Sequence, residues 1–167
     1  MMSTSYLRVV SILAGLFTCC STLADLGSTA EQLKARYGKD LLPPFSMEEY
    51  GVKVWLYACV YTRPPVISAE FRLMDDQVVY VAYETSDETL PTDYAFQLLQ
   101  NNRQGMSWQK TFDESGGGVR TLSFRRSDGA KADLVLSTVK GSVTITSAKW
   151  IATKAAYKAL PWYKKLF

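Results

Sequence analysis

Histidine is absent from this 167-residue chain, and its absence removes several kinds of chemistry. Without histidine there is no Ser-His-Asp or Cys-His nucleophile system and no imidazole ligand for zinc or iron. No glycine-rich phosphate loop is present, because Gly116-Gly117-Gly118 is not followed by the Lys-Ser/Thr helix start of such loops. The net charge of +3, without a long Lys/Arg block, predicts no nucleic-acid partner. We therefore predict no catalytic residue, no metal and no cofactor.

The first 24 residues have the features of a secretory signal peptide. Arg8 precedes a short apolar run over 9–17, and small residues end at Ala24. The run is too short to cross a hydrocarbon core of about 30 Å as a helix. The sequence predicts cleavage before Asp25 and export to the periplasm or the cell exterior. An alternative is a membrane-anchored lipoprotein, in which Cys19 carries the lipid.

Cysteine is scarce in the predicted mature chain. Two of the three cysteines, Cys19 and Cys20, fall within the predicted leader, which leaves Cys59. A single thiol forms no internal disulfide, so the fold must depend on packing alone. Because Cys59 lies in an apolar run, we predict a small buried side chain rather than a reactive thiol.

Helical and strand patterns alternate along residues 25–167. Helices are predicted over 29–37, from about 91 to 102 and from about 148 to 159, and strands over 52–60, 67–73, 77–84 and at intervals between 108 and 146. This order predicts an α+β fold, in which an antiparallel sheet carries helices packed on one face. We divide it into two tandem helix–three-strand units, 25–86 and 87–167, within one compact domain. The second unit includes the C-terminal helix.

Local signals mark both ends of the first predicted helix. Ser28 and Glu31 have the spacing of a capping box, in which each side chain bonds the backbone of the other residue. Gly38 follows the last helical residue, where a left-handed conformation commonly ends a helix.

Two segments resemble small exported bacterial proteins of uncharacterised function. They comprise Leu26-Gly27-Ser28-Thr29 through Gln32 to Ala35-Arg36-Tyr37-Gly38-Lys39, and LPTDYAFQLLQNN at 90–102 with Gly105, Trp108, Arg126-Ser127-Asp128-Gly129 and Thr144-Ile145-Thr146-Ser147. That group has no established catalytic residues to carry over. In element order the chain is also similar to BamE-like lipoproteins and to the tandem units of β-lactamase inhibitory protein, although Thr18 before Cys19 departs from the BamE-like pattern. The resemblance implies a binding role for a sheet with a helical layer on one face.

The predicted binding surface is one face of the strand over 52–60. It carries Lys53, Trp55, Tyr57 and Tyr61, and clustered tryptophan and tyrosine are enriched at binding hot spots. The other face carries Val52, Val54, Leu56, Ala58 and Val60, which we expect to contact the first helix. In the alternative arrangement, the second half of the chain folds over the aromatic face and buries it.

The remaining candidates are carboxylates and a basic tail. Adjacent acidic pairs occur at Glu48-Glu49, Asp75-Asp76, Asp87-Glu88 and Asp113-Glu114, but neighbours on a strand point to opposite faces. The basic and aromatic residues after 148 could contact an anionic membrane, but Pro161 interrupts an amphipathic helix and this contact is not favoured. The sequence favours a non-enzymatic module that binds another envelope or extracellular protein. A carboxylate-dependent hydrolase and a lipid-anchored structural component of the envelope are the alternatives.

Overall fold

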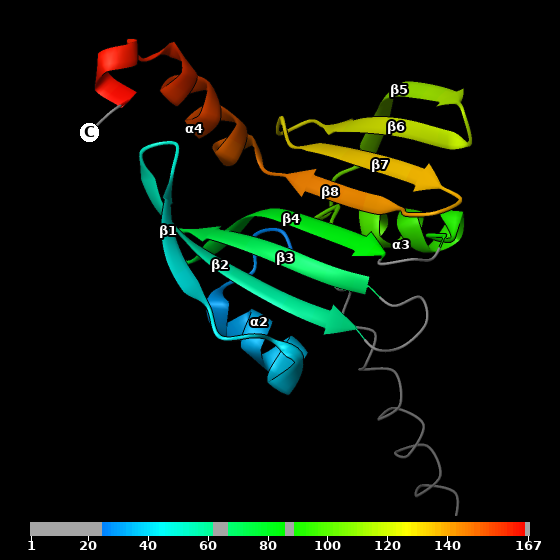
Figure 1. Ribbon diagram of the computed structural model, residues 1–167, viewed down its shortest axis with the longest axis horizontal. Helices are drawn as coiled ribbons and strands as arrows, with labels where there is room; N and C mark the ends of the chain where they lie inside the picture. The colour runs from blue at the N-terminus through cyan, green and yellow to red at the C-terminus, as the bar shows by residue number, and fades with distance from the viewer. Residues whose placement is uncertain (1–24, 62–66, 86–88, 166–167) are drawn as a thin grey trace, which may run out of the picture.

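A computed structural model describes residues 25–61, 67–85 and 89–165 of the chain (Figure 1). The predicted leader, with Cys19, lies outside these residues, as do the acidic pair Asp87-Glu88 and the side chain of Tyr61. The helices are α2 (Ala30–Tyr37), η1 (Gly38–Asp40), α3 (Thr92–Asn101), α4 (Ala148–Ala159) and η2 (Trp162–Lys165). The strands are β1 (Phe45–Glu49), β2 (Val52–Tyr61), β3 (Ile67–Met74), β4 (Gln77–Thr85), β5 (Trp108–Gly116), β6 (Val119–Arg126), β7 (Lys131–Ser137) and β8 (Ser142–Thr146).

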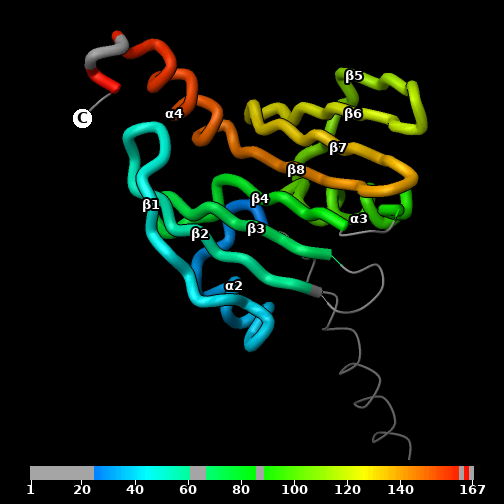
Figure 2. Tube along the Cα trace, in the orientation of Figure 1, coloured from blue at the N-terminus to red at the C-terminus, as the bar shows by residue number. Residues whose placement is uncertain are grey.

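All of these strands form one antiparallel sheet of eight strands, which confirms the α+β fold class. Their order in the sheet is β1-β2-β3-β4-β8-β7-β6-β5. Each half of the chain therefore supplies a helix followed by a four-strand meander, and the two meanders meet where β4 pairs with β8 (Figure 2). The predicted three-strand units each have one strand more. In the first unit the addition is β1, whose residues are almost all exposed and so have no alternating burial pattern.

The helix ends lie near their predicted positions, but the capping box of α2 is one residue later than predicted. The capping box is formed by Thr29 and Gln32 rather than by Ser28 and Glu31, because Thr29 has the extended backbone of an N-cap residue and accepts from the Gln32 amide. Gly38 ends α2 with a positive φ of 52°, but its ψ of −124° lies outside the left-handed helical region that was predicted. The prediction for α4 matches the observed bounds.

The main hydrophobic core lies between the sheet and the helices α2 and α3. Leu33 and Tyr37 of α2 and Leu98 and Leu99 of α3 belong to one cluster with the inward side chains of β2–β4 and β6–β8. A second, smaller cluster surrounds Trp150 of α4 on the opposite face. In Figure 1, α2 lies below β2, whereas α4 lies at the upper left. The prediction of helices on one face therefore applies to α2 and α3 but not to α4.

Candidate functional site

The predicted aromatic surface on β2 is not assembled as a set. Tyr57 is 6 % exposed and Cys59 is buried, and both belong to the core cluster that contains the α2 residues. The expectation that Val54 and its alternate neighbours contact α2 is therefore wrong, and Tyr57 offers no surface to a partner. Trp55 is 42 % exposed, and its ring lies 5.0 Å from the Lys53 ammonium. Lys53 and Trp55 are thus the accessible remainder of the predicted surface.

The opposite face of β1 and β2 carries exposed apolar side chains. Phe45 pairs with Leu56, and Met47 pairs with Val54, so these residues share a face with Ala58 and Val60. Leu42 continues the row, because its amide donates to the Ala58 carbonyl (2.8 Å). We call this set the apolar corner: Leu42, Phe45, Met47, Leu56, Ala58 and Val60. Its four most exposed members, Leu42, Phe45, Met47 and Val60, are 37 to 56 % exposed, which is unusual for large apolar side chains that share one sheet face.

A hollow of about 270 Å³ adjoins the apolar corner on β2, β3 and β4. Ala58 and Val60 of β2 line the hollow, and its other lining residues include Glu70 and Arg72 of β3 and Tyr80 and Glu84 of β4. The Arg72 guanidinium lies 4.6 Å from the centre of the Tyr80 ring and bonds Glu70 (2.9 Å). Burial raises the pKa of the Tyr80 phenol, so this hydroxyl stays protonated at neutral pH. The Arg72 guanidinium also donates to both carboxylate oxygens of Glu49, so its charge is already compensated. The hollow thus offers apolar walls and an aromatic ring.

The carboxylates of this hollow are ion-paired. Glu70 pairs with Arg72, and Glu84 pairs with Lys140 (2.7 Å). Among the described residues, no group of three His, Cys, Asp or Glu side chains is placed to hold a metal ion.

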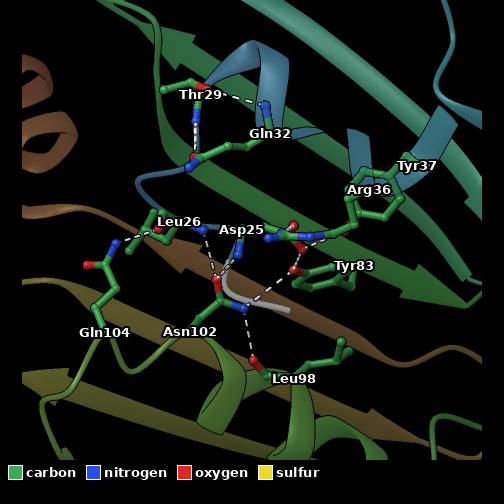
Figure 3. Close-up of polar contacts among 10 residues, drawn as sticks. All are labelled: Asp25, Leu26, Thr29, Gln32, Arg36, Tyr37, Tyr83, Leu98, Asn102 and Gln104. Carbon is green, nitrogen blue, oxygen red and sulfur yellow. Dashed lines mark hydrogen bonds and ion pairs between the residues drawn. The ribbon is translucent and has the colours of Figure 1, made fainter. Parts of the chain in front are cut away.

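Sequence reasoning missed a buried polar network that joins the two halves of the chain (Figure 3). The Asp25 carboxylate, in a residue 1 % exposed, accepts hydrogen bonds from Arg36, from the Tyr37 hydroxyl (2.7 Å) and from the Tyr83 hydroxyl. The Asn102 side-chain oxygen accepts from the amides of Asp25 (3.0 Å) and Leu26 (2.9 Å).

The same network extends from Asn102 to Arg126 on β6. The Arg126 guanidinium donates to the Asn102 carbonyl (2.9 Å), bonds both Asp128 carboxylate oxygens and lies 5.2 Å from the Trp108 ring centre. Within the described part of the chain, every buried side-chain nitrogen and oxygen has a hydrogen-bond partner. Asp25 and Asn102 are buried, whereas Arg126 and Asp128 line a hollow of about 220 Å³ beside Leu26 and Gly27. The buried part of the network connects the two halves of the fold. Its partners are up to 77 residues apart, and no local pattern signals such a contact.

Burial also determines the properties of the remaining candidates. The prediction of a buried Cys59 is confirmed, and desolvation raises the pKa of its thiol to about 12. Burial alone would lower the pKa of Arg36, but the Asp25 carboxylate outweighs it and the pKa is raised. No helix in the described ranges is long and apolar enough to cross a bilayer.

Comparison with protein-family models, with curated proteins and with solved structures finds no match to this chain. The functional argument therefore depends on the sheet face itself. Of the surfaces described above, the apolar corner with its adjoining hollow has the composition and exposure of a binding surface.

Proposed function

We propose that this chain is an exported, non-enzymatic module of the periplasm or cell envelope that binds another protein through the face of the sheet carrying the apolar corner. The observation that carries the proposal is the exposure of Leu42, Phe45, Met47 and Val60 on one face of β1, β2 and the segment before β1. Large apolar side chains grouped on a surface gain free energy when a partner removes them from water, at about 25 cal/mol per Å².

The arrangement of layers supports the same proposal. Two helices cover the other face of the sheet, so that face is occupied by the protein's own core. On the face that we assign to the partner, α4 buries Trp150 against Val54 and Val79, and the apolar corner lies outside that cluster. The proteins that the chain resembles in element order also act by binding, with a helical layer on one side of an antiparallel sheet.

Export is part of the proposal. Cleavage before Asp25 would make the nitrogen that donates to Asn102 the α-amino group of the mature protein. The mass of the N-terminal peptide of protein isolated from its own cells tests this step. An N-terminus at Asp25 supports a soluble exported protein, a lipid-modified Cys19 identifies a tethered one, and a retained Met1 contradicts export.

Site-specific photo-cross-linking in the cells that encode the protein tests the binding surface. A photoreactive amino acid replaces Phe45 in the apolar corner, and a matched variant carries it at Lys34, which is exposed on α2. We expect a discrete protein adduct at position 45 but not at 34, and we expect its loss when Val60→Asp is added. Identical adducts at both positions, or none at position 45, would contradict this surface.

A further inference from the structure

The second half of the same sheet face is basic, and its cations lack acidic partners. Arg125 on β6, Lys131 on β7, and Lys154 and Lys158 on α4 line two hollows of about 330 and 280 Å³, which share Lys131 and Asp133. Within residues 25–61, 67–85 and 89–165, none of these four side chains pairs with a carboxylate. Lys154 is nevertheless half-buried. We call this set the basic groove.

The uncompensated positive charge makes the basic groove receptive to anions. Arg125, Lys131 and Lys158 are exposed, and the half-buried Lys154 ammonium, which has no counter-charge, attracts a carboxylate that reaches it. The carboxylate already present, Asp133, accepts a hydrogen bond from the Ser123 hydroxyl (2.6 Å) and balances at most one of the four positive charges. The groove thus retains an excess of positive charge.

The register of the sheet connects the basic groove with the apolar corner. Paired residues form one row across the face: Phe45, Leu56, Arg72, Tyr80, Thr146, Lys131 and Arg125. Leu56 and Lys131 are four strand spacings apart, which is about 19 Å at about 4.8 Å per strand. An extended segment of about six residues spans that distance at about 3.3 Å per residue.

We propose that the basic groove binds carboxylate side chains of the protein partner, in an acidic segment that lies about six extended residues from the partner's apolar anchor. This inference rests on the proposed function, because it assigns the second contact of the same face. The groove also contains Ile151 and Ala155 beside its cations. A peptide can present acidic and apolar side chains to such a recess, whereas a flat anionic membrane cannot enter a hollow between a helix and a sheet.

Fluorescence anisotropy with defined peptides tests the inference on the whole protein. The probe is a labelled twelve-residue peptide of alternating Glu and Leu, and the reference probe has Gln in place of every Glu. We expect binding of the Glu peptide to be at least about 10-fold tighter, and to weaken as salt is raised from 20 to 150 mM, because exposed charges are screened. Equal affinities for the two peptides would overturn the inference.

Charge-altered variants locate the site. Lys154→Gln with Lys158→Gln removes two charges from the groove, and Lys34→Gln with Lys39→Gln removes two exposed charges elsewhere as the matched control. We expect only the first pair to reduce the affinity for the Glu peptide, by about 10-fold. Lys154→Glu with Lys158→Glu is expected to bind a Lys-Leu peptide instead, which a merely unfolded variant would not do. Equal losses in the two double variants would contradict the assignment.

Two further outcomes separate this inference from the proposed function. The first outcome concerns vesicles that contain anionic phospholipid. The inference would be overturned in favour of a membrane surface if the wild type binds these vesicles, the Lys154 and Lys158 variants do not, and the wild type does not bind the Glu peptide. Loss of peptide binding specificity with an intact adduct at position 45 would refute the basic groove alone. Loss of that adduct with retained Glu-peptide binding would instead refute the apolar corner.

Discussion

Replacement of Asn102 by alanine tests whether the buried polar network holds the start of the folded chain. The residue is fully buried, and its side-chain oxygen accepts from two buried backbone nitrogens, those of Asp25 (3.0 Å) and Leu26 (2.9 Å). Its side-chain nitrogen donates to the Leu98 carbonyl (2.9 Å). Alanine leaves these groups in place without the partner, and each unsatisfied buried group costs about 1–3 kcal/mol.

The two unsatisfied backbone nitrogens alone predict a loss of about 3 kcal/mol in the free energy of unfolding, a large part of the 5–15 kcal/mol that is typical of a small domain. With a urea dependence of about 2 kcal/mol per M, the unfolding midpoint of Asn102→Ala falls by about 1.5 M. Urea unfolding followed by circular dichroism measures this shift. Asn101→Ala is the matched control, because Asn101 is half-buried and its side chain makes no hydrogen bond among the described residues. A difference below about 0.5 kcal/mol between the two variants would refute the reasoning.

Three other perturbations have expected outcomes. Hydrogen bonds from Arg126 lower the pKa of Asp128, so its contribution to stability is present above the ordinary carboxyl pKa of about 3.9 and is lost as the pH falls through the lower folded value. Asp128→Asn should therefore destabilise the protein in urea at pH 7, and the effect should shrink progressively as the pH falls below about 3.9; an effect that stays constant as the pH falls would contradict the pairing. Cys59, with a pKa of about 12, should resist iodoacetamide at pH 8 until urea unfolds the protein, as peptide mass mapping can show; equal rates would contradict its burial. Trp150→Ala should cost about 3–5 kcal/mol in urea unfolding, and a loss below about 1 kcal/mol would contradict its place in the second core.

Local patterns identified the helices and the strands other than β1, but they did not give the orientation of β2. Alternation identified the strand, and Pro161 marked the chain just beyond the end of α4. Both faces of β2 contain apolar residues, however, because Tyr57 enters the main core and Val54 enters the cluster around Trp150. When a strand is buried on both sides, periodicity does not tell which face meets which helix.

The candidate sites depended on contacts that no local pattern contains. The apolar corner forms because β1 pairs with β2. The residues of β1 are almost all exposed, so its sequence has no sustained alternation of apolar and polar residues that would identify a strand. The basic groove brings Lys131 together with Lys154 and Lys158 through the packing of α4 near β7 and β8. The basic composition of the C-terminal segment was evident in the sequence, but its neighbours were not.

The two outermost strands of the sheet, β1 and β5, both carry charged side chains. On β5, Lys110, Asp113 and Glu114 are exposed, and a bulge interrupts the register beside Lys110. The other border is β1, which is only five residues long and ends in Glu48-Glu49. Short, charged and bulged borders oppose the strand-by-strand addition of further copies that produces fibrils. With such edge strands, the protein can expose the apolar corner to water without adding further copies along the edges of its sheet.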